Sequence, residues 1–193
     1  MNEGSTYRRC QNLDVNAEAP LAHCDQCPLR DRPLVAGYGP RRADRVVVGE
    51  APGETEVVLG MPFVGKAGGR LNEALVASGV DRSTIYITNT VLCHPVGNES
   101  PPPRQAITAC HERLINEVQQ RMPMKVLALG GTACRALTGD SRPIEQLQML
   151  RPAPSPYLGG EAELRVTYHP SALTRNPAWP GRFDEDIGWL GEL

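Results

Sequence analysis

The 193-residue sequence contains no apolar run near the roughly 20 residues that a membrane-spanning helix needs. Its first residues, MNEGSTYRRCQNLDVN, also lack the apolar core of a signal peptide. We therefore expect a cytoplasmic protein that makes no contact with a membrane. The formal net charge is only −2, so the chain has no global basic field that would indicate nucleic-acid binding, although a local basic face would suffice.

Six cysteines stand out in this sequence, because cysteines in a reducing compartment more often bind metals or do redox chemistry than form disulfides. Cys24 and Cys27 have the Cys-x2-Cys spacing that suits two thiolates on one metal centre. Cys93 and Cys110 are separated by sixteen residues (110−93−1), which is too wide for a zinc-ribbon knuckle. Four thiolates bind either tetrahedral zinc or a [4Fe–4S] cluster. The other two cysteines are interpreted as ordinary thiols: Cys10 and Cys134.

The order of apolar segments predicts the fold class. Strand-like runs at 45–48, 85–88, 125–129 and 164–168 alternate with helical patterns at 67–78, 103–121, 131–138 and about 180–191. Alternating strands and helices indicate right-handed crossovers and a parallel sheet, so we expect an α/β protein with four parallel strands. We expect one domain over residues 1–193, in which about 1–40 form an irregular arm with a weakly indicated helix at 10–25.

The stretch GEAPGETEVVLGMPFVGKAGGRL, residues 49–71, joins the first predicted strand to the first predicted helix. Gly53 and Gly65 are expected to permit tight turns and close approach of a ligand to the backbone. The amides of residues 66–69, at the start of the helix, are suited to holding an anion. The alternative is an ordinary glycine-rich connection between a strand and a helix.

Polar side chains follow three of the predicted strands. In an open parallel sheet, binding sites form beyond the carboxyl ends of the strands. Side chains that are far apart in the sequence are therefore expected to converge there: Glu50, Glu56, Phe63, Asn89 and His169.

Four segments, GEAPG at 49–53, GMPFVGKAG at 60–68, ITNTVLCHPVGN at 87–98 and YHPSAL at 168–173, resemble the family 4 uracil-DNA glycosylases. These are iron–sulfur base-excision enzymes of bacteria and archaea, and the matching motifs run from about 24 to 175. The resemblance implies a three-layer α/β/α fold of the uracil-DNA glycosylase type and excision of uracil from single- or double-stranded DNA by a monomer. It also implies a [4Fe–4S] cluster held by Cys24, Cys27, Cys93 and Cys110.

The resemblance and the chemistry of uracil excision together suggest roles for individual side chains. His169 would donate a hydrogen bond to the charge that develops at uracil O2. Phe63 offers a stacking face, and Asn89 has the donor and acceptor that match uracil O4 and N3–H. Glu50 and Glu56 would position water near C1′ or support the loop, and an alternative role for Glu56 is to exclude the methyl group of thymine.

The expected site falls into three sets beyond the cysteines. The catalytic residues are Glu50, Glu56 and His169. The substrate-binding residues are Gly49, Ala51, Pro52, Gly53, Phe63, Asn89 and Ser171. The DNA-binding residues are Lys66, Leu173 and Arg175, with Leu173 the apolar wedge that enters the duplex.

This sequence departs from the family pattern in places that leave the preferred base open. Leu92 and His94 flank Cys93 where the family often has two basic residues, and Val57 follows Glu56 where the family often has Asp. A glycosylase for hypoxanthine, hydroxymethyluracil or mismatched thymine is therefore an alternative. So are a non-catalytic module that binds uracil in DNA and an electron-transfer protein. The binding module would not need the catalytic side chains, and the electron-transfer protein would not need the GEAPG motif, so the presence of both argues against these two alternatives.

Overall fold

The computed structural model describes residues 8–9, 21–160 and 162–192. Its centre is a parallel sheet of four strands in the order β4-β3-β5-β6. The strands are β3 (Arg45–Gly49), β4 (Ile85–Asn89), β5 (Lys125–Leu129) and β6 (Glu163–Thr167). The four predicted strands are confirmed to within one residue at each end. The two central strands, β3 and β5, are nearly continuous apolar runs because helices cover both faces of the sheet.

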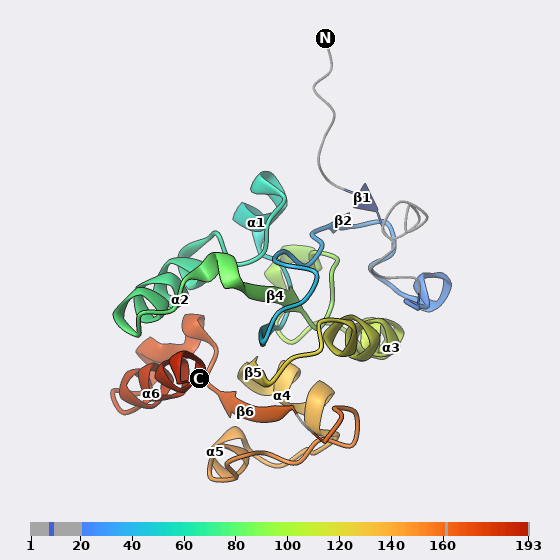
Figure 1. Cartoon of the computed structure of the whole chain (residues 1–193). Helices are drawn as coiled ribbons and strands as arrows, with labels where there is room; N and C mark the ends of the chain where they lie inside the picture. The colour runs from blue at the N-terminus through green and yellow to red at the C-terminus, as the bar shows by residue number, and fades with distance from the viewer. Residues whose placement is uncertain (1–7, 10–20, 161, 193) are drawn as a thin grey trace.

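Two layers of helices enclose the sheet, so the three-layer α/β/α architecture is confirmed (Figure 1). On one face α2 (Lys66–Ala77) and α6 (Trp179–Gly191) pack on side chains such as Val47 and Leu127. On the other face α3 (Arg104–Gln120), α4 (Gly130–Thr138) and the short α5 (Ile144–Gln148) pack on Val46 and Val48. Successive residues of β3 thus serve opposite cores, as the two-residue period of a strand requires.

The strand order places a topological switch point in the middle of the sheet. The chain runs from β3 outward to β4 and then returns to β5 on the other side of β3. The connections that leave the carboxyl ends of β3 and β5 therefore diverge, which opens a crevice where ligands bind in folds of this class. The connection after β3 contains a further helix, α1 (Glu54–Leu59), in a segment that the sequence indicated only as a loop.

The described part of the N-terminal arm runs along β4. Residues 21–40 contain the 3₁₀ turn η2 (Cys24–Gln26) and β2 (Pro33–Leu34), which pairs with β1 (Arg8–Arg9). The backbone of Tyr38 exchanges two hydrogen bonds with Ile87, at 2.8 and 2.9 Å, so the arm covers an edge of the sheet that would otherwise be open. Most of the helix predicted at 10–25 lies outside the described residues. None of the described helices is long and apolar enough to cross a bilayer.

Candidate active site

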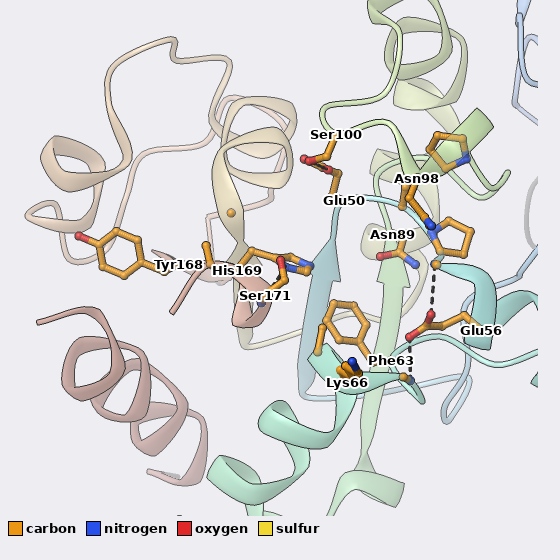
Figure 2. Close-up of a pocket in the computed structure, with 18 of the residues that line it drawn as sticks. Glu50, Glu56, Phe63, Lys66, Asn89, Asn98, Ser100, Tyr168, His169 and Ser171 are labelled. Carbon is orange, nitrogen blue, oxygen red and sulfur yellow. Dashed lines mark hydrogen bonds between the residues drawn. The ribbon is translucent and has the colours of Figure 1, made fainter. Parts of the chain in front are cut away.

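A cavity of about 760 Å³ opens at the carboxyl ends of the strands. Loops after β3, β4, β5 and β6 contribute its walls, so the predicted convergence of distant polar residues is confirmed (Figure 2). Predicted site residues that line it are Glu50, Ala51, Pro52, Gly53, Glu56, Phe63, Lys66, Asn89, His169, Ser171 and Arg175. Gly49 lies just behind the wall, and Leu173 does not line the cavity.

Asn89, the last residue of β4, points its amide into this cavity (Figure 2). It is buried, and its Oδ1 has no hydrogen-bond partner among the described residues. Gly49 is opposite Asn89 on β3, and a Cβ at Gly49 would lie 2.4 Å from that Oδ1 and 2.5 Å from the ring of Phe63. Only glycine allows the amide and the ring to meet here. An unpaired buried carbonyl oxygen is costly, so Oδ1 is suited to a donor that a ligand brings.

Phe63 is held in an unusual backbone conformation, with a φ of 54°. That left-handed region costs a bulky residue on the order of 1–3 kcal/mol and occurs mostly at functional sites. The start of α2 packs directly on this residue, because a Cβ at Gly68 would lie 1.9 Å from the carbonyl oxygen of Phe63. The ring of Phe63 is 5.8 Å from that of His169, centroid to centroid, across the cavity.

His169 follows β6 and caps the 3₁₀ helix η5 (Pro170–Arg175). Its Nδ1 is 2.8 Å from Ser171 Oγ and 3.3 Å from the Ser171 amide nitrogen. Because an amide N–H only donates, Nδ1 accepts, and the neutral ring carries its proton on Nε2. Burial lowers the pKa of His169, which the charges of Glu50 and Glu56 oppose and that of Arg175 reinforces. The cavity thus receives a neutral imidazole with one N–H to donate.

Glu50 is held between the loop after β4 and the start of α4. Its Oε1 accepts from Ser100 Oγ at 2.5 Å, and its Oε2 accepts from Thr132 Oγ1 at 2.6 Å. Each carboxylate oxygen keeps a further lone pair for a water molecule. Neither hydroxyl was predicted, because a serine before three prolines and a threonine at the start of a helix carry no signal that they share a partner.

Glu56 acts as a clamp on the loop that joins β3 to α2. Its two carboxylate oxygens accept from the amides of Gly53 at 3.1 Å and Gly65 at 2.9 Å, the residues that cap α1 and α2 (Figure 2). The φ values of these glycines are −89° and −85°, so neither position needs the left-handed backbone that favours glycine. They leave room for the carboxylate, since a Cβ would lie 2.8 Å from it at Gly53 and 3.1 Å at Gly65. This geometry favours loop support over water activation for Glu56.

The rim of the cavity carries two exposed cations and an aromatic pair. Lys66 begins α2 and Arg175 ends η5, where both can reach a phosphate. Trp179 lines the cavity and stacks on Tyr168, with ring centroids 4.3 Å apart and planes 10° apart. Leu173 is only 5% exposed and packs in the core beside α2 and α6, so the prediction that it is the apolar wedge is wrong.

The cysteines with predicted metal roles gather on the far side of β4. Cys27, Cys93 and Cys110 belong to one apolar cluster, against which Cys24 packs. The amide of His23, next to Cys24, donates to the carbonyl of Ala109, next to Cys110, at 2.9 Å. The fold therefore brings the Cys-x2-Cys turn onto α3, although no group of three or more His, Cys, Asp or Glu among the described residues is arranged to hold a metal ion.

The charges of these thiols are coupled. Burial raises the pKa of Cys24 to about 12, and the neighbouring Cys110 and Cys27 add to the rise. Adjacent thiolates repel one another in an apolar setting, and a bound cationic metal centre relieves that repulsion, so this donor set fits a metal centre. Cys24, Cys27 and Cys110 are free thiols, as the expectation of reduced cysteines requires.

Of the two cysteines without a predicted metal role, only one lies among the described residues. Cys134 is buried among apolar side chains of α4 and the sheet, where it packs as a small hydrophobe, in agreement with its interpretation as an ordinary thiol. Cys10 lies outside the described residues.

Comparisons with known proteins agree with this geometry. A family model described as the uracil DNA glycosylase superfamily matches residues 36–188. A type-4 uracil-DNA glycosylase of Pyrobaculum aerophilum is 38% identical over 172 residues, which cover 86% of this chain and 87% of the relative. Relatives of the same description from Thermotoga maritima and Archaeoglobus fulgidus are 36% and 31% identical. Their alignments cover 88% and 90% of this chain and 87% and 89% of the relatives.

Proposed function

Because this chain belongs to the uracil DNA glycosylase superfamily, we propose that it is a DNA-repair hydrolase that cleaves the N-glycosidic bond of uracil in DNA and leaves an abasic site. The unpaired Oδ1 of Asn89 is the observation that carries this proposal. Uracil brings the missing donor, N3–H, and its O4 accepts from the amide nitrogen of Asn89. Cytosine has an unprotonated N3 and an amino group at C4, so it mismatches both atoms.

Binding of the base requires that the nucleotide leave the stack and enter the cavity. Phe63 then provides one face for stacking, and its fixed backbone means that the ring is in place before the base arrives. Lys66 and Arg175 at the rim would hold the flanking phosphates.

Cleavage separates a uracil anion from a sugar with oxocarbenium character. The Nε2–H of His169 donates to uracil O2 as negative charge develops there, and the neutral ring keeps this proton. Glu50 orients a water molecule toward C1′, and its negative charge favours the cationic sugar. The water oxygen bonds to C1′, its proton passes to Glu50 or solvent, and the bond from C1′ to N1 breaks.

The cysteines support the proposal of a cofactor. Cys24, Cys27, Cys93 and Cys110 would hold a [4Fe–4S] cluster, which when bound supplies a cross-link between the N-terminal arm, the loop after β4 and α3. No step of base excision runs through it. A structural zinc ion is the alternative occupant. We also propose that residues 1–193 form one domain that acts as a monomer in the cytoplasm.

The test is incubation with oligonucleotides that carry uracil, hypoxanthine, hydroxymethyluracil or mismatched thymine, followed by alkaline cleavage at abasic sites. We expect strand cleavage at uracil, in single- and double-stranded DNA. Cleavage at another base alone would assign the chain to that lesion. Retention of uracil-containing DNA without cleavage would make it a binding module, and the absence of both would overturn the proposal.

A further inference from the structure

A completely buried arginine lies directly behind the end of β4. Arg113 of α3 is 0% exposed. Its Nη2 donates to the carbonyl oxygens of Asn89 and Thr90, at 2.9 and 2.7 Å. Its Nη1 donates to Glu117 one helical turn later and reaches Thr88 Oγ1 at 3.4 Å. One guanidinium therefore spans three consecutive residues, the last two of β4 and the one that follows it, and Asn89 is the middle one.

The partner of this arginine is equally buried. Glu117 is 1% exposed, and it also accepts from the hydroxyl of Tyr86 at 2.6 Å. Apolar residues of similar volume often replace a buried ion pair without loss of stability, so stability alone does not explain why this core holds two charges. The planar guanidinium, in contrast, fixes two carbonyl groups through Nη2 while Nη1 is held by Glu117, a defined relation that no apolar side chain provides.

The two carbonyl groups lie at the point where the chain leaves the sheet. The other side of that turn is also held, because the amide and the hydroxyl of Thr90 donate to the carbonyl of Gly49 at 2.9 and 2.8 Å. The backbone of Asn89 is thus fixed from α3 and from β3, while its side chain carries the unpaired Oδ1 in the cavity. The direction of that amide follows from the direction of the peptide that Arg113 holds.

We propose that Arg113 is a positioning residue that sets the orientation of Asn89 for base recognition. This role rests on the proposed function. Misplacement of a binding group by about 1 Å can lower a rate by roughly 10²-fold, so the effect of Arg113 should be visible in the rate of excision. It should disappear when Asn89 has no amide left to orient.

Two variants avoid leaving a lone charge in the core. Arg113→Lys keeps the charge but loses the planar guanidinium, and Arg113→Met/Glu117→Gln removes both charges while Gln can still accept from Tyr86. We expect the single-turnover rate constant for uracil to fall roughly 10- to 100-fold in the double variant and less in Arg113→Lys. The amplitude, which reports the folded fraction, should stay. Arg121→Met is the control, because that buried arginine follows α3, donates to the carbonyl of Arg41 and lies over the ring of Tyr86, so it perturbs the same core from the side of Tyr86 rather than from the backbone of Asn89.

The decisive arm repeats Arg113→Met/Glu117→Gln in an Asn89→Ala background. We expect less than about a two-fold further loss there, because contacts that act through one group are not additive. An equal fold-loss in both backgrounds, an unchanged rate constant in the presence of Asn89, or a loss of amplitude alone would each overturn the positioning role. A wild-type enzyme that does not release uracil would overturn the proposed function and this role with it. An active wild type with additive losses would overturn only the role of Arg113.

Discussion

Asn89 and His169 face the same cavity with opposite hydrogen-bonding groups. Asn89 presents an unpaired acceptor, and His169 presents the N–H that remains when its Nδ1 accepts from Ser171. Uracil carries a donor at N3 next to an acceptor at O2, so one edge of the base meets both residues. Recognition of the base and stabilisation of the leaving group would therefore draw on neighbouring atoms of the same ring.

Removal of the His169 side chain should slow the chemical step. We expect His169→Ala to lower single-turnover excision of uracil by roughly 10²–10³-fold, the usual loss for one preorganised donor. Affinity for undamaged DNA, measured by anisotropy, should change little. A variant that releases uracil at the wild-type rate would show that His169 only shapes the loop.

The lowered pKa of His169 predicts how the excision rate and the free energy of unfolding depend on pH. Burial lowers its pKa below the ordinary 6.5, so the ring stays neutral in the folded protein when an unfolded chain already takes up a proton. As pH falls through 6.5, excision should persist, while the free energy of unfolding should decrease until the folded-state pKa is reached. Rates and urea unfolding measured on the same buffer series check both parts, with His169→Gln as a variant that does not titrate. A rate that halves at or above pH 6.5 would contradict the assignment.

Asn89→Asp tests the base-reading residue directly. The substitution replaces the amide donor with a second acceptor, which then faces uracil O4. Sites built around a hydrogen bond reject a mismatched partner by roughly 10⁴-fold, and uracil excision should fall on that scale. The measurement is single-turnover cleavage of single-stranded DNA with excess enzyme, which removes base pairing from the comparison. Wild-type cleavage by Asn89→Asp would show that Asn89 does not read the base.

At the scale of elements, the entry to α2 is the most constrained part of the site. Glu56 holds the caps of α1 and α2 together, and α2 packs against the carbonyl of Phe63 through Gly68. The stacking ring therefore depends on the seating of a whole helix. A residue that touches no substrate can in this way control the cavity.

Two adjacent glycines of α2 provide a matched pair of variants that tests whether the position of Phe63 depends on the packing of α2. A Cβ at Gly68 would lie 1.9 Å from the Phe63 carbonyl oxygen, whereas a Cβ at Gly69 meets nothing within 4 Å. Gly69→Ala should raise the free energy of unfolding by about 0.5–1 kcal/mol, as expected in a helix interior. Gly68→Ala should lower it by about 1–3 kcal/mol, the usual cost of overpacking, and should slow excision. Urea unfolding with parallel rate measurements distinguishes them, and equal stability of the two variants would contradict the packing argument.

Local signals explain which elements were predictable. β5 was predicted at its observed bounds because a run of apolar residues reports a strand buried on both faces. α1 was missed because its six residues lie between glycines and depend on the carboxylate of Glu56, which reaches Gly53 and, nine residues away from itself, Gly65. The periodicity of apolar residues in the sequence does not reveal a contact between a side chain and a distant backbone amide.

The sequence predicted which residues converge at the candidate site, but not the partners that hold them. Parallel strands end at one edge, so the convergence of Glu50, Asn89 and His169 followed from the strand assignments. The partners of Glu50 and the burial of Leu173 did not follow, because both depend on how separate helices pack. The role of Arg113 was also not predicted. A charged residue within a helical pattern is usually interpreted as solvated, and its burial depends on how α3 packs on the sheet.

At the scale of the whole molecule, the cysteine cluster joins the N-terminal arm to α3. Protein purified without oxygen and with a reductant should be brown and contain about four irons per chain. Cys24→Ala and Cys110→Ala should lose the colour and melt at lower temperature, whereas Cys134→Ala, which alters a separate apolar cluster, should keep the colour. Iron analysis, absorbance and thermal melting provide the readouts. A colourless wild-type protein with about one zinc per chain would establish a structural zinc site instead.

The two tryptophans of the chain both belong to α6 and lie toward opposite ends of the strands. Trp179 lines the cavity and stacks on Tyr168, whereas Trp189 is 3% exposed and packs against Lys125, at the amino end of β5. A nucleotide that enters the cavity changes the surroundings of one indole and leaves the other as it was. The intrinsic fluorescence of this protein therefore contains both a reporter of occupancy and its own internal reference, so base entry can be timed optically without an attached dye.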